Sequence, residues 1–208
     1  MGSSANEMGK APQGKTSRRE VERQAQRRRH MNAPIANPDA KAAFSAALGS
    51  AFPPVLDVCC GAKMMWWDKH HPHATYMDKR SGNFTSQHKK LQRVDVSPDV
   101  VASFTNIPYP DESFWLVVFD PPHFENLGKN SKIANIYGEL LGNWRDDLRA
   151  GFRECFRVLK PNGTLIFKWS EMDIAVGEIV ALAPQLPLFG HQTRRHGKTH
   201  WLAFLKTI

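Results

Sequence analysis

One stretch decides the fold of this chain: Trp115-Leu116-Val117-Val118-Phe119-Asp120-Pro121-Pro122-His123. Its first five residues are apolar, which is typical of a strand buried on both faces of a parallel sheet. The run ends at an acid, and two prolines follow that cannot continue a hydrogen-bonded ladder. Ligands of open α/β sheets bind beyond the carboxyl ends of the strands. Asp120 is therefore predicted to lie at a functional edge, although an ordinary strand-ending turn would have the same short sequence.

The length, charge and cysteine content limit the kinds of protein that the chain can be. Its 208 residues suit one domain with a substantial core. It has neither the long apolar run of a membrane span nor an apolar N-terminal signal, so we expect no membrane contact. Cys59, Cys60 and Cys155 do not suggest a disulfide framework, which favours the cytoplasm. The net charge of +8 suits a nucleic acid partner.

Residues 1–33 differ in composition from the rest of the chain. They contain almost no large apolar residues, and eight Lys and Arg against three Glu give them a charge of +5. We expect a basic, flexible N-terminal arm that either grips nucleic acid phosphates or remains a solvated tail. Residues 34–208 are expected to form the folded domain, entered through a short Ala-rich helix over Ala40–Leu48.

Apolar runs and helical periodicity predict the remaining elements of an α/β fold. Strands are expected over 55–58, 74–78, 99–102, 164–169, 186–190 and 200–206, with a possible strand near 91–96. Apolar residues at three- and four-residue steps predict one helix from about Tyr137 to Leu159 and another over Glu171–Ala183. The first of these strands leads into Asp57 and a turn at Gly61, and the second ends at Asp78. Both strands thus carry an acid near their ends.

Four segments together resemble class I S-adenosylmethionine-dependent methyltransferases, in that family's order. Asp120-Pro121-Pro122-His123 is similar to the Asp/Asn-Pro-Pro-aromatic motif of the amino-methyltransferases, and 55–63 is similar to the family's glycine-turn motif. Residues 103–118 and 159–165 resemble the family's segments before and after the Asp/Asn-Pro-Pro-aromatic motif. The resemblance covers roughly 53–208 and implies a Rossmann-like, doubly wound, seven-stranded, mostly parallel sheet with an antiparallel last strand.

The resemblance implies S-adenosylmethionine as cofactor and assigns residues to it. The expected cofactor contacts are Asp57, Cys59, Cys60, Gly61, Asp78, Ser103 and Phe104. In the family's catalytic motif the acid and the next carbonyl accept hydrogen bonds from the target amine. Asp120 and the carbonyl of Pro121 would then orient the amine, while Pro122 stiffens the turn and His123 packs on the acceptor.

The chain departs from the family at several of these positions. His123 replaces the aromatic residue that stacks on a base, and Ser103 replaces an acid that contacts adenine. Cys59 and Lys63 stand where many members have Gly or Phe. His70, His71 and His73 match no zinc signature, so we expect no metal.

The motif and the basic charge predict methylation of an exocyclic amino nitrogen of a nucleobase, adenine before cytosine, in DNA or RNA. Lys129, Asn130, Arg194, Arg195 and Lys198 are candidate substrate contacts in two polar loops. Two alternatives remain: a methyltransferase for a small molecule or protein, and a catalytically inactive nucleic-acid-binding protein with the same fold. The oligomeric state stays open.

Overall fold

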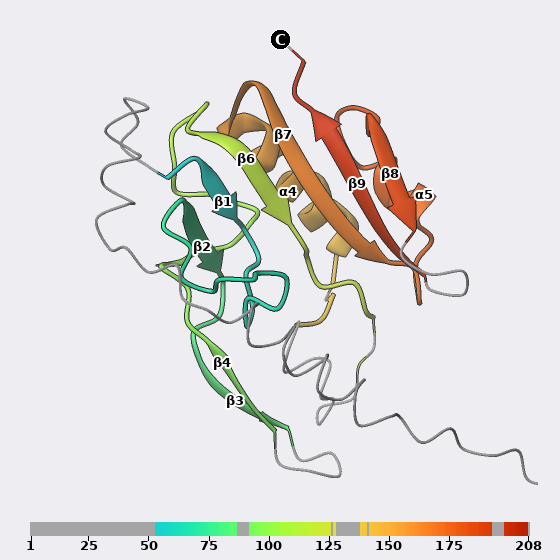
Figure 1. Ribbon diagram of the computed structural model, residues 1–208. Coiled ribbons are helices and arrows are strands. Elements are labelled where there is room, and N and C mark those ends of the chain that lie inside the picture. Colours follow the sequence, from blue (N-terminus) through green and yellow to red (C-terminus); the bar gives the residue numbers. More distant parts are fainter. Residues whose placement is uncertain are drawn as a thin grey trace, which may run out of the picture. The chain divides into compact units, whose positions relative to one another are not determined.

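The computed structural model describes residues 53–86, 92–125, 127, 138–140, 142–192 and 198–207. The predicted arm, the Ala-rich segment 40–48 and the predicted domain boundary at residue 33 lie outside these residues. The described part is built on a seven-stranded sheet (Figure 1). None of its helices is long and apolar enough to cross a membrane.

The sheet has the strand order β5-β2-β1-β6-β7-β9-β8. Neighbouring strands run parallel from β5 to β7, and β9 runs antiparallel to both β7 and β8. The predicted Rossmann-like sheet with an antiparallel last strand is therefore confirmed. Its strands are β1 (Val55–Asp57), β2 (Ala74–Asp78), β5 (Val100–Val101), β6 (Phe114–Phe119), β7 (Leu159–Ser170), β8 (Phe189–Gln192) and β9 (Thr199–Leu205).

The strand order reverses between β1 and β6, which lie side by side in the middle of the sheet. The connection after β1 leads to β2 on one side of the pair, whereas the connection after β6 leads to β7 on the other side. This separation opens a crevice at the carboxyl ends of the two strands, where doubly wound folds bind their ligands. Asp57 and Asp120 stand at that edge.

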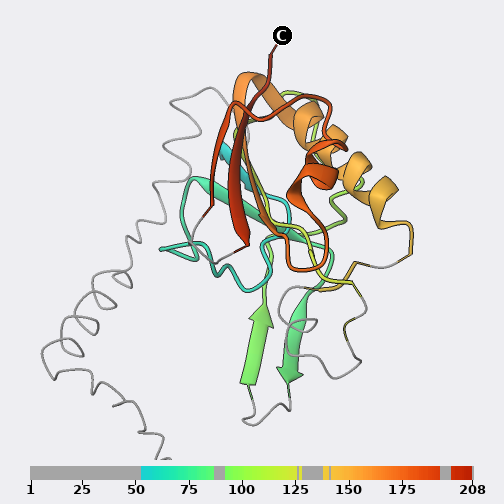
Figure 2. The same ribbon diagram turned by 90° about the vertical axis from the view of Figure 1, so that its right-hand side faces the viewer.

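Two helices, α4 (Trp144–Val158) and α5 (Val176–Val180), pack on the same face of the sheet (Figure 2). The buried side of α4 carries the predicted apolar stripe, and Phe152 at its centre is fully buried against Phe119, Phe167 and Phe204. This contact anchors the helix on β6, β7 and β9 and forms the middle of the core.

Both helices are shorter than the periodicity predicts. Gly138 and Gly142 have φ of +82° and +57°, conformations that end a regular helix, so α4 begins at Trp144. The carboxylate of Glu171 accepts a hydrogen bond from the N–H of Val176, which closes a loop before α5. The apolar spacing of these segments therefore reflects packing in loops as well as in helices.

A separate hairpin replaces a helix between β2 and β5. β3 (Gly82–Ser86) and β4 (Gln92–Val96) form an antiparallel two-stranded sheet. The possible strand near 91–96 is thus confirmed, whereas β3 was not predicted because Phe84 is its only large apolar residue. The connection from β1 to β2, residues 58–73, consists of turns and bends without a helix.

Residues 160–163, which precede the predicted strand over 164–169, form an irregularity within β7. Phe114 pairs with Leu159, but Leu116 pairs with Thr164, so several residues of β7 bulge from the ladder. Asn162 adopts φ of +61° at this bulge. Beyond it β7 continues regularly to Ser170, which carries its last side chains past the end of β6.

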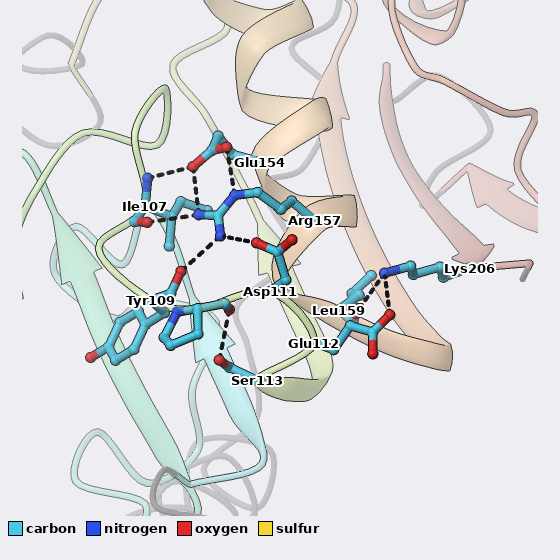
Figure 3. Close-up of polar contacts among 10 residues, drawn as sticks. Ile107, Tyr109, Asp111, Glu112, Ser113, Glu154, Arg157, Leu159 and Lys206 are labelled. Carbon is cyan, nitrogen blue, oxygen red and sulfur yellow. Dashed lines mark hydrogen bonds and ion pairs between the residues drawn. The ribbon is translucent and has the colours of Figure 1, made fainter.

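Arg157 near the end of α4 fastens the connection between β5 and β6 (Figure 3). Its guanidinium donates hydrogen bonds to the carbonyl oxygens of Ile107 and Tyr109, each at 2.8 Å. It also pairs with Glu154 and Asp111, both at 2.8 Å. The connection held in this way includes Phe104, a predicted cofactor contact.

Replacing Arg157 with alanine is expected to lower the free energy of unfolding by about 2 kcal/mol. The substitution removes the guanidinium donor of two carbonyl oxygens and of the mostly buried Glu154 carboxylate, which keeps a hydrogen bond from the N–H of Ile107. Urea denaturation measures the change. Arg149→Ala is the matched control, because Arg149 on the same helix is exposed and pairs only with Asp146 among the described residues. A loss for Arg157→Ala no larger than for the control would contradict the anchoring role.

Candidate active site

Three acids gather at the carboxyl edge of the central strands. Asp57 ends β1, Asp78 ends β2, and Asp120 directly follows β6. Two adjoining hollows lie against these residues, with about 360 and 270 Å³ of empty space, part of it open to solvent. The hollows share Cys59 and Arg80 as lining residues. Together they form one cleft, in which Asp120 lines the first hollow and Asp78 the second.

Asp57 is fully buried at the floor of the first hollow. Its carboxylate accepts hydrogen bonds from Trp66 Nε1 at 2.7 Å and from the N–H of Cys59 at 3.2 Å. Burial raises the pKa of Asp57 to about 7, against the effect of these two donors, and the nearby charges of Asp120 and Asp78 add to the rise. Near neutral pH this carboxyl group can therefore change its charge when a cation enters the hollow.

Asp78 joins the glycine turn to the end of β2. Its Oδ2 accepts a hydrogen bond from the N–H of Gly61 at 2.9 Å, and its Oδ1 accepts two from Arg80, through the main-chain N–H at 2.9 Å and Nε at 3.3 Å. A carboxylate can accept about four hydrogen bonds, so Asp78 retains acceptor capacity toward the second hollow.

The turn after β1 keeps a glycine-like backbone despite its unusual residues. Gly61 and Lys63 have φ of +47° and +55°. The Lys63 side chain lies over the ring of Tyr76, with Nζ 3.9 Å from the ring centroid, and does not line either hollow. Burial raises the pKa of the Cys59 and Cys60 thiols, which therefore stay uncharged at neutral pH.

Asp120 is held by a lysine that sequence reasoning missed. Lys168 on β7 places its Nζ 2.6 Å from Oδ2 of Asp120. The other oxygen, Oδ1, is buried and accepts no hydrogen bond from the described part of the chain. Asp120, a lining residue of the first hollow, thus carries one satisfied and one unsatisfied oxygen.

His123 does not line either hollow of the cleft. Its ring is buried between Phe124 and Trp169, at centroid distances of 4.7 and 5.8 Å. Nδ1 lies 3.1 Å from the carbonyl oxygen of Pro121, where a protonated Nδ1 donates a hydrogen bond. Burial lowers the pKa of His123, so the ring is neutral at pH 7. In this arrangement Nδ1 of His123 and the carbonyl oxygen of Pro121 are hydrogen-bond partners.

The predicted residues divide into three groups by position. The cleft brings together Asp57, Cys59, Cys60, Gly61, Asp78, Phe104, Asp120 and Pro122. Ser103 lies outside its lining, and its Oγ instead bonds Thr105 at 2.8 Å. Lys198 is exposed beside β9, and its carbonyl accepts a hydrogen bond from the N–H of Glu171. Lys129, Asn130, Arg194 and Arg195 lie outside the described residues.

Gly151 on α4 lets Phe104 reach the second hollow. A Cβ atom at Gly151 would lie 2.7 Å from Cδ2 of Phe104 and 2.9 Å from Cζ of Phe119. Gly151→Ala is therefore expected to displace Phe104 and to weaken cofactor binding by about three- to tenfold, the lower end of overpacking effects. Calorimetric titration with S-adenosylhomocysteine measures this. Gly177→Ala on α5 is the control, because nothing lies within 4 Å of its Cβ position; equal affinities for the two variants would contradict the prediction.

The described residues contain no group of three or more His, Cys, Asp or Glu side chains arranged to hold a metal ion. His71 and His73 pack edge to face, with ring centroids 5.3 Å apart.

No family model and no curated protein matches the chain. Among the solved structures that are similar to the chain are three with 11–14% sequence identity. A protein of Pyrococcus horikoshii is 13% identical, with 79% of this chain and 86% of that chain covered and a TM-score of 0.49. A SAM-dependent methyltransferase from Methanosarcina mazei is 11% identical over 74% of this chain and 92% of its own, with a TM-score of 0.45.

The third is a mutant of the 16S rRNA (adenine(1408)-N(1))-methyltransferase from Catenulisporales acidiphilia, crystallised with SAM. It is 14% identical, with 83% of this chain and 92% of that chain covered and a TM-score of 0.45. Function therefore has to be inferred from the residues of the cleft.

Proposed function

We propose that this chain is an S-adenosylmethionine-dependent methyltransferase that acts on an exocyclic amino nitrogen of a nucleobase, adenine before cytosine. One observation carries the proposal: Oδ1 of Asp120 is a buried acceptor without a partner in the described part of the chain, and Asp120 lines the same hollow as Asp57 and Gly61. A buried acceptor of this kind is expected to be satisfied by a ligand.

The cleft fits a cationic cofactor with an adenosine group. Asp57, Asp78 and Asp120 favour a positive charge, and the uncharged cysteine thiols add none of their own. Asp78 has acceptor capacity for ribose hydroxyls, and Phe104 offers an apolar wall in the second hollow. When bound, S-adenosylmethionine supplies a methyl group to the attacking nitrogen, as the C–S bond breaks and sulfur keeps its electron pair.

The role of the protein in the transfer is to orient and stabilise the amine. Oδ1 of Asp120 accepts a hydrogen bond from the target N–H, which aims the nitrogen lone pair at the methyl carbon. The carboxylate stabilises the positive charge that grows on nitrogen and receives the proton that the methylated nitrogen loses. Pro121 and Pro122 fix the main chain that carries Asp120, since each proline restricts φ.

The net charge of +8 supports a nucleic acid substrate. A base within a duplex would have to be flipped out to reach the cleft, so single-stranded DNA or RNA is the first substrate to test. The buried ring of His123 favours a second candidate, a small molecule or protein amine, because no motif aromatic faces the cleft as a stacking platform.

Calorimetric titration with S-adenosylmethionine and S-adenosylhomocysteine tests the proposal first. We expect micromolar affinity, about −8 kcal/mol. Transfer of a labelled methyl group is then measured on single-stranded DNA, RNA, duplex DNA and small amines. Transfer to nucleic acid alone supports the nucleobase assignment, and transfer to small amines alone supports the second candidate. A folded protein that binds neither cofactor form contradicts both and leaves a catalytically inactive, nucleic-acid-binding fold.

A further inference from the structure

We propose that Lys168 is a positioning residue for methyl transfer, which holds Oδ2 of Asp120 so that Oδ1 is presented to the acceptor amine. This inference rests on the function proposed above and adds a residue to it. It starts from the neighbouring positions of two strands that are far apart in the sequence. Phe119 at the end of β6 pairs with Phe167 of the parallel strand β7. The residues that follow them, Asp120 and Lys168, therefore lie side by side.

The pair is close and largely withdrawn from water. Nζ of Lys168 lies 2.6 Å from Oδ2 of Asp120, and the two side chains are 19% and 9% exposed. Trp201, the partner of Lys168 on β9, also contacts the ammonium group, with its ring centroid 5.8 Å from Nζ. These contacts limit the positions available to a side chain that is otherwise long and flexible.

The unequal use of the two carboxylate oxygens distinguishes this pair from a structural ion pair. Structural pairs that are withdrawn from water usually satisfy both oxygens, because an unpaired buried acceptor is unfavourable. Here Lys168 occupies Oδ2 only, while Oδ1 accepts no hydrogen bond from the described residues. Nδ1 of His123 is 3.9 Å from Oδ1, beyond hydrogen-bond distance. The arrangement fixes the rotation of the carboxylate and leaves one oxygen for an incoming donor.

Lys168 also places a positive charge directly beside Asp120. The other charged or titratable groups near Asp120 are Asp57 on β1, Cys59 and Arg80 in the lining of the cleft, and His123 in the same turn. Among the described residues, Lys168 is the cation in direct contact with the carboxylate. Without it, Oδ2 would lose its donor and the orientation of Oδ1 toward the amine would no longer be fixed.

The test compares Lys168→Met and Lys168→Arg with Lys160→Met as a matched control. Lys160 is also on β7 and also lies over a tryptophan ring, that of Trp115 at 5.6 Å, but it lies near the opposite end of the strand. The first measurement needs no cofactor: the carbon-13 chemical shift of the Asp120 carboxyl group is compared among the variants at pH 7. We expect it to change in Lys168→Met, which removes the donor to Oδ2, and to change little in Lys168→Arg and in the control.

The second measurement is methyl transfer to the acceptor found in the screen. Lys168→Met is expected to lower kcat at pH 7 by about 10- to 100-fold, with KM for the cofactor within about threefold. Lys168→Arg is expected to restore most of the activity. If Lys168→Met does not fold, Lys168→Gln replaces it as the neutral variant.

Each outcome bears on one of the two proposals. Active wild type, together with a neutral Lys168 variant whose carboxyl signal and kcat match the control, overturns the role of Lys168 and leaves the methyltransferase proposal intact. A changed carboxyl signal with unchanged kcat also overturns it, because the pair would then be only structural. Wild-type protein that neither binds S-adenosylhomocysteine nor transfers a methyl group overturns the proposed function itself.

Discussion

Asp120→Ala is expected to lower kcat for methyl transfer by about 10²- to 10³-fold, the usual loss when one preorganised group that stabilises transition-state charge is removed. Affinity for S-adenosylhomocysteine is expected to stay within about threefold, because this product carries no sulfonium charge for Asp120 to attract. The substitution removes both the acceptor for the amine and the anion beside Lys168. A long lysine side chain can then turn toward solvent, so we expect the fold to survive.

Two further variants make the result specific. Asp120→Asn keeps one carbonyl oxygen as acceptor but removes the charge, and we expect it to retain more activity than Asp120→Ala if hydrogen bonding to the amine dominates. Asp147→Ala is the control, because Asp147 is an exposed acid in the first turn of α4. Measurements are kcat and KM for the acceptor, calorimetric affinity for S-adenosylhomocysteine, and the melting temperature. An Asp120→Ala variant with near wild-type kcat would exclude Asp120 from the transfer step.

The central strands were predictable because burial on both faces leaves a direct mark in the sequence. β1, β2 and β6 are runs of apolar residues that end at an acid, and the family resemblance supplied their order. Helix ends were less predictable, because they depend on conformations such as φ of +57° at Gly142 that apolar spacing does not encode. The hairpin strand β3 was not predictable, because main-chain hydrogen bonds to β4 define it and no pattern of apolar side chains marks it.

Within the site, positions that follow directly from a strand end were predictable, and partners across strands were not. Asp57, Asp78 and Asp120 each end an apolar run, so topology alone brings them to one edge. Lys168 appears in the sequence as a polar residue within a strand, and only the register of β6 against β7 brings it to Asp120. The inward turn of His123 depends on Phe124 and Trp169, and no motif encodes that packing.

Asp57 gives the second large expected effect, a loss of stability between about pH 4 and pH 7. Its pKa is about 7 in the fold because it is fully buried, whereas an unfolded aspartate has a pKa of about 3.9. Between these values the native state holds a proton that the unfolded state has released, so the free energy of unfolding falls as pH rises. At about 1.4 kcal/mol per pKa unit, the total is about 4 kcal/mol and is reached slightly above pH 7.

Comparison with Asp57→Asn isolates this contribution, because asparagine is neutral throughout and the other titrating groups are common to both proteins. Urea denaturation from pH 4 to pH 8 is expected to show wild type losing stability relative to Asp57→Asn as pH rises. A constant difference between the two would contradict the high pKa of Asp57.

The titration of Asp57 is also expected to affect cofactor binding. A sulfonium cation in the cleft favours ionised Asp57, so affinity for S-adenosylmethionine should increase from pH 6 to pH 8 more than affinity for S-adenosylhomocysteine, which lacks the sulfonium charge. Asp57→Asn should abolish that difference in pH dependence, because asparagine does not change its charge in this range.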